Sequence, residues 1–207
     1  MFALVDKSDN SITKMLNGNK GITIGENQYP RAIFTLWTEA ERNAINIYTV
    51  TIDESKRKNE QWYINTNITY SFDGSNATGS YGDATARAHA DTTWTQQQID
   101  DGDAPSGADT DTVAVEGLKT ILIRQVKAQA EGELNRTDWY ITRKAEKNTA
   151  IPSAITTHRD AVRSKQAAME TAITNASDTP ALETLYTYTR QEDGTSTRPL
   201  GELPTLE

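Results

Sequence analysis

Residues 134–146 read L-N-R-T-D-W-Y-I-T-R-K-A-E, and this stretch decides how the C-terminal half of the chain is built. Thr137 or Asn135 suits the N-cap of a helix that begins near Asp138, because short polar side chains accept hydrogen bonds from the free N–H groups of a first helical turn. Trp139 then lies in that turn and is expected to anchor the core. The pattern predicts a helical hairpin that specifies the fold.

Helical spacing continues on both sides of this stretch. Apolar residues over 113–135 recur every three or four positions, which is typical of an amphipathic helix. A third helix is expected to start at Pro152, because the missing N–H of proline is no loss in a first turn. Ile155, Val162 and Met169 recur there every seven residues. The spacing therefore predicts two long helices around a shorter one, and a short last helix opened by Pro180 follows them.

Charged residues on these helices are expected to meet across the hairpin. Glu146 is placed to pair with Arg159 and Arg163, each pair contributing about 0–1 kcal/mol if exposed. Trp139→Ala is expected to destabilise the helical module by about 3–5 kcal/mol, the range for a buried tryptophan.

Composition divides the chain into four parts. They are a β-rich α+β domain over 1–72, an acidic Gly/Asp-rich linker over 73–111, a helical module over 112–190 and an extended tail over 191–207. The linker holds eight acidic residues and one basic residue, so it carries nearly all of the chain's net charge of -8. Segments with few apolar residues and one sign of charge do not form a core of their own. The expected fold class is α+β.

The first domain shows signals of both strands and a helix. A turn at 17–21, N-G-N-K-G, predicts a hairpin between strands at 11–16 and 22–24. Thr38 and Glu41 form a capping box, which predicts a helix near 39–46.

Two further strands are expected after that helix. Apolar and polar residues alternate over 47–53 and 61–72, which is typical of half-buried strands. The basic segment 56–60 is the expected turn between them. Within the alternation, Trp62 is a candidate core anchor.

Composition also excludes several kinds of chemistry. The 207 residues include no Cys and only two His, which excludes disulfides, thiolate metal sites and a centre with several histidines. The acidic balance argues against nucleic acid and against anionic membrane as partners, because both attract basic surfaces. The start of the chain does not resemble a signal peptide. We expect no cofactor and no metal.

Motifs of known catalytic sites are missing from the sequence. It has no phosphate-binding loop, no G-x-S-x-G and no H-E-x-x-H. His89 and His158 are expected to lie in a loop and on a helix, without a catalytic role. The acidic residues of the linker do not have the spacing of a calcium-binding loop. We therefore expect the protein not to be an enzyme.

Two stretches resemble segments of bacteriophage tail proteins. Residues 36–50, L-W-T-E-A-E-R-N-A-I-N-I-Y-T-V, resemble the pattern T-x-E-E-R-x-A-x-G-I-Y-P-V near the N-terminus of small phage tail proteins. Asn46 and Thr49 stand where that pattern has Gly and Pro.

The second resemblance includes the opening stretch. Residues 134–146, with Pro152 and 158–163 after them, are similar to the segment L-x-x-T-D-W-x-x-x-R-x-x-E … P-x-x-W-x-x-Y-R-x-x-L-R of phage tail-fibre assembly and tail-assembly-chaperone-like proteins. Ile155 and His158 replace the Trp and Tyr of that segment. The two stretches occur in the family's order.

The resemblance implies a non-enzymatic structural or assembly protein that acts by protein–protein binding near the tail-fibre or baseplate attachment. Its expected place is the virion tail, or the host cytoplasm during assembly. Its expected partners are other tail or fibre proteins and further copies of itself, in a homo-oligomer or symmetric assembly. The residues expected to specify the fold or to bind partners are Trp37, Glu41, Arg42, Tyr48, Trp62, Trp94, Thr137, Asp138, Trp139, Arg143, Glu146, Pro152, Arg159 and Arg163.

Two alternatives remain open at this point. A carbohydrate- or host-receptor-binding module would use exposed aromatic residues on the 61–72 strand and around Trp94. A hydrolase acting on polysaccharide would use a pair of carboxylates.

Overall fold

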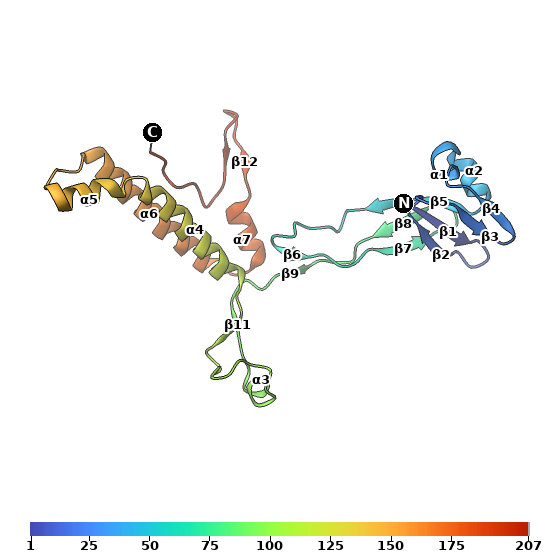
Figure 1. The fold of residues 1–207 in the computed structure, drawn as a ribbon, viewed down its shortest axis with the longest axis horizontal. Helices are drawn as coiled ribbons and strands as arrows, with labels where there is room; N and C mark the ends of the chain where they lie inside the picture. Colours follow the sequence, from blue (N-terminus) through green and yellow to red (C-terminus); the bar gives the residue numbers. More distant parts are fainter. Residues whose placement is uncertain (207) are drawn as a thin grey trace. The chain divides into compact units, whose positions relative to one another are not determined.

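The computed structural model of the protein describes residues 1–206, which divide into two compact units between Thr85 and Ala86 (Figure 1). The first unit is built on a β-sheet and the second on helices, so the fold class is α+β, as predicted. None of the helices in the described part of the chain is both long and apolar enough to cross a membrane.

A five-stranded sheet forms the first unit. Its strands are β1 (Phe2–Asp6), β2 (Ser11–Leu16), β5 (Ile47–Asp53), β7 (Thr69–Phe72) and β8 (Ala77–Ser80), in the order β2-β1-β5-β8-β7. The β5–β8 pair is parallel and the other pairs are antiparallel. The edge strands β2 and β7 approach each other, so the sheet curls towards a barrel.

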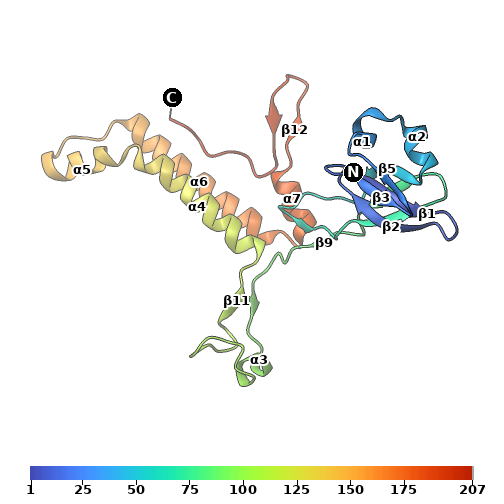
Figure 2. The same cartoon turned by 45° about the vertical axis from the view of Figure 1, so that its right-hand side comes forward.

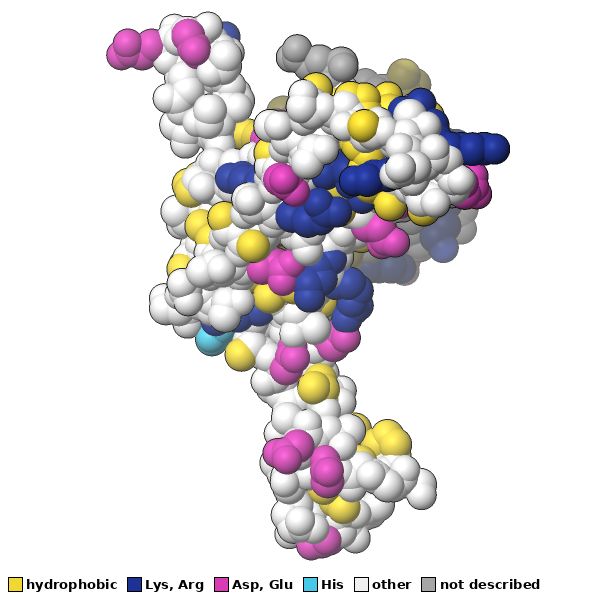
Figure 3. Space-filling view, turned by 90° about the vertical axis from the view of Figure 1, so that its left-hand side faces the viewer, with side chains coloured by type: hydrophobic (Ala, Val, Ile, Leu, Met, Phe, Trp, Pro, Cys, Tyr) yellow, Lys and Arg dark blue, Asp and Glu magenta, His cyan; other side chains and the backbone are white. Residues whose placement is uncertain are grey.

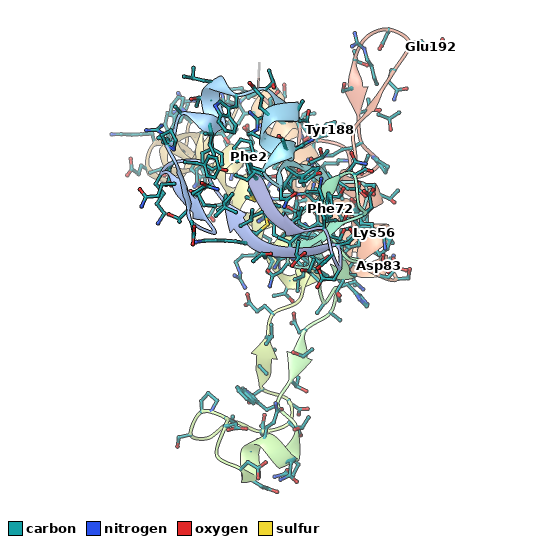
Figure 4. All side chains as sticks on the ribbon, turned by 90° about the vertical axis from the view of Figure 1, so that its right-hand side faces the viewer. Phe2, Lys56, Phe72, Asp83, Tyr188 and Glu192 are labelled. Atoms are coloured by element: carbon teal, nitrogen blue, oxygen red, sulfur yellow. The ribbon has the colours of Figure 1, made fainter. Side chains whose placement is uncertain are left out.

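Strand β1 is covered on both faces, which explains its almost continuous apolar sequence F-A-L-V. Ala3 and Val5 pack with Tyr48, Phe72 and other residues in one cluster. Phe2 and Leu4 point the other way, against Ile33 and Phe34 of a short helix. Figure 4 labels Phe2 and Phe72, which belong to these two clusters. The core of this unit therefore has two layers that share one strand.

The remaining elements of this unit lie in the connections between the sheet strands or, for β9, after the last of them. They are β3 (Ile22–Ile24), β4 (Asn27–Tyr29), α1 (Ile33–Leu36), α2 (Glu39–Ala44), β6 (Tyr63–Ile64) and β9 (Thr85–Ala86), the last of which spans the division between the units. The predicted pairing of 11–16 with 22–24 is wrong. Both segments are strands, but β2 pairs with β1 and β3 pairs with β4. The sequence signal of the turn is local, whereas β2 pairs with β1 along its whole length, from Ser11 opposite Asp6 to Leu16 opposite Phe2.

The predicted helix near 39–46 and the predicted strand at 47–53 are confirmed as α2 and β5. The side chain of Thr38 accepts from the backbone N–H of Glu41, and the Glu41 carboxylate accepts from that of Thr38, so the capping box is complete. The predicted strand 61–72 is interrupted, because only 63–64 and 69–72 form strands. Its alternation is also broken: Trp62 and Tyr63 are both buried, and Ile64 is 56% exposed.

Helices α4 and α6 lie side by side and antiparallel in the second unit (Figures 1 and 2). Its helices are α3 (Gln96–Asp100), α4 (Leu118–Asn135), α5 (Asp138–Lys147), α6 (Ser153–Asn175) and α7 (Thr179–Tyr186), and its strands are β10 (Thr92–Thr93), β11 (Val113–Val115), β12 (Thr189–Arg190) and β13 (Ser196–Thr197). The buried apolar residues of the helix pair are Leu118, Leu122, Val126, Ala130, Ile155, Val162, Met169 and Ile173. The three predicted positions of α6 at seven-residue spacing are among them.

The expected start of the long helix at 113 is wrong. Val113–Val115 is a strand, β11, that pairs with β10, and the helix begins only after Gly117. The segment 73–111 is also more than a linker. Residues 77–80 form β8 inside the sheet, and 86–111 belong to the second unit. Both differences arise from pairing with residues distant in sequence, which a local pattern does not contain.

We expect Leu122→Ala to destabilise the helical unit by about 2–5 kcal/mol, because the side chain is 2% exposed between α4 and α6. Guanidinium unfolding followed by circular dichroism at the helical band measures this change. Gln129→Ala, at an exposed position of the same helix, is the matched control and should change the unfolding free energy by less than about 0.5 kcal/mol. Equal effects of the two variants would contradict the packing of α4 on α6.

Candidate interaction surfaces

A buried arginine joins α6 to the turn between α4 and α5. The Nη1 of Arg159 donates to the carbonyl oxygen of Leu134 at 2.8 Å, to Oγ1 of Thr137 at 2.7 Å and to Oδ1 of Asp138 at 2.7 Å. The Leu134 carbonyl lies in the last turn of α4, where backbone acceptors have no partner within the helix. Thr137 is 1% exposed and donates its own hydroxyl to the same carbonyl. These four residues fix where α4 ends and where α5 begins.

The predicted ion pairs across the hairpin are only partly as expected. Arg159 does pair between helices, but with Asp138 rather than with Glu146. Arg163 pairs with Asp160 one turn earlier on its own helix, and both side chains are exposed. Glu146 is exposed and forms no ion pair with any of residues 1–206. Pro152 immediately precedes the first residue of α6 and occupies the N-cap position.

Helix α5 presents an aromatic face to solvent. None of its residues is buried. The rings of Trp139 and Tyr140 lie 3.8 Å apart, and the guanidinium of Arg143 lies 4.6 Å from the Trp139 ring and 5.2 Å from the Tyr140 ring. We call Trp139, Tyr140 and Arg143 the α5 face. The Arg143 Nε is enclosed and has no hydrogen-bond partner among the described residues.

The expectation that Trp139 anchors the core is therefore wrong. Its side chain is 52% exposed, and the neighbouring Ile141 is 43% exposed. The buried residue at this turn is Thr137, and its hydroxyl accepts a hydrogen bond from Arg159. Since α5 lies beyond the α4–α6 contact, Trp139→Ala removes little buried surface, and the earlier expectation of 3–5 kcal/mol does not apply.

A two-stranded ribbon projects from the end of the helix pair where α4 begins (Figures 1 and 2). We call residues 92–115 the arm; it contains β10, α3 and β11. At its base, the Asp91 carboxylate accepts from the Gly117 N–H at 2.6 Å and from the Thr120 hydroxyl at 2.8 Å. The carbonyl oxygens of Ala88 and His89 accept from the next two N–H groups, those of Leu118 and Lys119. The N-terminus of α4 is thus capped by the strand that enters the arm.

Gly117 is required at this crossing. A Cβ at residue 117 would lie 2.2 Å from the carbonyl carbon of Ala90, so the two backbones can approach only because Gly117 has no side chain. A further hydrogen bond, from the Thr179 hydroxyl to the carbonyl oxygen of Arg87 at 2.6 Å, fastens the same strand to the start of α7. The arm therefore leaves the helical unit from a fixed base.

Sequence reasoning missed this base. Asp91 and Gly117 are 26 residues apart, and neither belongs to a motif. The only local signal is a glycine directly before a helical pattern. His89, which the sequence places near Asp91, contributes its carbonyl group here, and the Asp91 carboxylate binds Gly117 and Thr120.

The C-terminal hairpin β12–β13 is fastened by a polar cluster. The Tyr188 hydroxyl donates to Glu202 at 2.6 Å, and Arg198 pairs with the same carboxylate at 2.7 Å. The hydrogen bond to Glu202 raises the pKa of Tyr188 above its usual value. Figure 4 shows Glu192 near the tip of this hairpin and Tyr188 at its foot.

The predicted residues of the first unit lie mainly in its core. Tyr48 and Trp62 are buried, and the Tyr48 ring packs 4.6 Å from that of Phe72. Trp37 packs edge-on against Tyr29, and its carbonyl oxygen accepts from Arg42. Glu41 caps α2, and the N–H and hydroxyl of Thr38 lower the pKa of its carboxyl. That capping interaction is thus present above the usual carboxyl pKa and lost as pH falls through the lowered value.

The remaining predicted aromatic residue lies in the arm. Trp94 is half-buried and lies directly after β10. Its backbone N–H donates to the Thr112 carbonyl oxygen at 3.1 Å. Within residues 1–206 there is no group of three or more His, Asp or Glu residues that could hold a metal ion. His158 is buried on α6, and its Nε2 has no hydrogen-bond partner among the described residues.

No protein-family model matches the chain, and comparisons with curated proteins and with solved structures found no significant match. The resemblance to phage tail proteins therefore stays a prediction.

We expect Arg159→Met to destabilise the helical unit by about 2–4 kcal/mol, because it leaves the buried oxygen of the Thr137 hydroxyl without its donor and removes one of the donors to the Leu134 carbonyl. Thermal and guanidinium unfolding measure the change. The control Arg163→Met alters an exposed pair on the same helix and should stay within about 0.5 kcal/mol of the parent protein. If the two variants have equal stability, Arg159 does not tie α6 to the turn.

Replacing Gly117 or Gly132 by alanine should change the free energy of unfolding in opposite directions. Gly117→Ala forces the backbone of residue 90 away and should destabilise by about 1–3 kcal/mol. Gly132→Ala, inside α4 with nothing within 4 Å of the new Cβ, should stabilise by about 0.5–1 kcal/mol. Unfolding midpoints in guanidinium test both. A stabilising Gly117→Ala would show that the arm does not cross α4 closely.

Proposed function

We propose that the chain is a structural or assembly component of a bacteriophage tail, and that it acts by binding other tail proteins without catalysing a reaction. The observation that carries the proposal is the α5 face. Trp139, Tyr140 and Arg143 form a stacked cluster on a helix none of whose residues is buried.

The α5 face has the composition of a protein-binding hot spot. Tryptophan, tyrosine and arginine are the residue types most enriched among side chains that dominate binding energy at interfaces. Here the rings and the guanidinium already contact one another, so a partner need not order them on binding. The Arg159 cluster holds the start of α5 at a defined place on the helix pair. An exposed Trp on a fixed helix is therefore best explained by a partner that covers it.

The positions shared with the phage patterns also support the proposal. The second pattern contains the Leu, Thr, Asp and Arg that here are Leu134, Thr137, Asp138 and Arg159, and these four residues form one hydrogen-bonded cluster. In the first pattern, the glycine corresponds to Asn46, whose φ of 63° lies in the left-handed region that glycine and asparagine favour. The residue types that the patterns share with this chain are thus ones that its hydrogen bonds or its backbone conformation require.

The carbohydrate-binding alternative finds less support in the geometry. Trp62 and Tyr63, expected on an exposed strand, are buried. Trp139 is exposed, but Tyr140 and Arg143 both pack on its ring. A sugar needs a free aromatic face for stacking, so these residues suit a protein contact better.

The proposal predicts a fixed number of copies of this chain per tail. Quantitative mass spectrometry of purified virions of the source phage should find that number, in a multiple of three or six if the site is symmetric. The variant Trp139→Ala/Arg143→Ala should fold with nearly unchanged stability, because α5 buries little, yet its number per virion should fall by about tenfold or more, as expected from losing two hot-spot residues. Lys144→Ala, on the same helix, is the control.

Two results separate the possible roles. Absence from virions together with a loss of assembled fibres on gene deletion would indicate an assembly chaperone and leave the binding proposal in place. Absence from virions with a normal yield of infectious particles after gene deletion would overturn the proposal.

A further inference from the structure

The arm carries apolar side chains that nothing in its own unit covers. Val113 and Val115 of β11 are 44% and 62% exposed, and they pair with Thr93 and Thr92 of β10 across an irregularity in the register. The strand pairs only with β10, and a two-stranded ribbon alone is marginally stable in water. Because the base of the arm is fixed, Val113 and Val115 are exposed at a defined place, where another surface could bury them.

Charge restricts what that surface can be. The arm holds Asp100, Asp101, Asp103, Asp109 and Asp111 and no Lys or Arg. In Figure 3 the projecting arm shows acidic but no basic side chains, and Lys and Arg side chains lie above it. The pKa of Asp109 is lowered by the Thr112 hydroxyl and the Asp111 N–H, so this carboxylate stays ionised in mild acid. A matching surface must combine apolar side chains with basic ones.

The first unit has a hollow of that kind, of about 650 Å³, between β2 and the start of β3. Its apolar lining includes Met15, Leu16, Ile22 and Phe34, and Lys14 and Lys20 stand beside them. Neither lysine forms an ion pair with any described residue, and the lining contains no carboxylate. We call this site the β2 hollow.

The floor of the β2 hollow is well defined. Gly18 has a φ of 70°, and a Cβ there would lie 3.1 Å from the Phe2 ring and 3.2 Å from Phe34. The chain thus turns closely over two aromatic rings between the lysines. Strand β2 is at the edge of the sheet order, so its outer side has no strand of that sheet hydrogen-bonded to it.

We propose that the arm of one copy of this chain seats on the β2 hollow of a second copy. The chain carries both halves of a complementary pair: an acidic ribbon with two exposed valines, and an apolar hollow with two unpaired lysines. Such a contact is head-to-tail, so it builds a ring or an open array and leaves the α5 face free for other proteins. The inference extends the proposed function but uses different surfaces, so either can fail alone.

The test is self-association of the purified full-length chain, measured by sedimentation velocity over a wide concentration range. We expect a mass above that of the monomer, which increases with concentration and decreases between about 0.05 and 0.5 M salt because exposed charges are screened. The hollow variant Lys14→Glu/Lys20→Glu and the arm variant Asp103→Lys/Asp111→Lys each place like charges at the contact. Each alone should associate roughly tenfold more weakly or worse.

Mixing the two variants is the decisive step. The hollow variant then offers an acidic arm to the unaltered lysines of the other chain, and its own acidic hollow receives the basic arm, so association should return. The control Lys144→Glu, on α5, should associate like the parent chain, and so should Trp139→Ala. A monomer at every concentration would overturn the inference. Variants that associate normally, or a mixture that stays monomeric, would overturn it as well.

Discussion

The contact of Arg159 with the turn between α4 and α5 is the constraint on which the helical unit depends. One guanidinium nitrogen serves a backbone carbonyl, a hydroxyl and a carboxylate, all from the five residues 134–138. Because Arg159 and Thr137 are both nearly buried, no water replaces the guanidinium at the Thr137 hydroxyl, and removing Arg159 leaves that oxygen without a donor. The long helices then lie antiparallel with Leu122, Val162 and Met169 between them, and α5 is left outside that contact with its aromatic residues in solvent.

A second constraint works at the opposite end of α4. There the entering strand of the arm supplies the groups that cap the helix, through the Asp91 carboxylate and the carbonyl groups of residues 88 and 89. The absent side chain of Gly117 lets the backbones cross. The two ends of α4 therefore do different things: one end places the α5 face, and the other places the arm. Both candidate surfaces are exposed, and each is held at its base by several hydrogen bonds to the helix pair.

Local sequence signals were reliable where a few neighbouring residues decide the outcome. The capping box of α2, the start of α6 after Pro152 and the strand at 47–53 follow from such signals. Helix α5 begins at Asp138 as expected, but the Thr137 side chain binds Leu134 and Arg159 and does not cap the helix. The pattern failed where partners are distant. The hairpin expected at 11–24 was replaced by pairing of β2 with β1, Val113–Val115 became a strand opposite β10, and Trp139 was mistaken for a core residue.

The fold class, most of the helices and the acidic character of the arm can be predicted from the amino-acid sequence, because these depend on composition and on spacing within a few turns of chain. Which side chains are buried depends on the tertiary contacts. An apolar residue such as Trp139 looks the same in a sequence whether another element covers it or not, and Asp91 gains its role only when Gly117 lies beside it. Burial and long-range hydrogen bonds depend on how distant segments meet, and that information is spread over the whole chain.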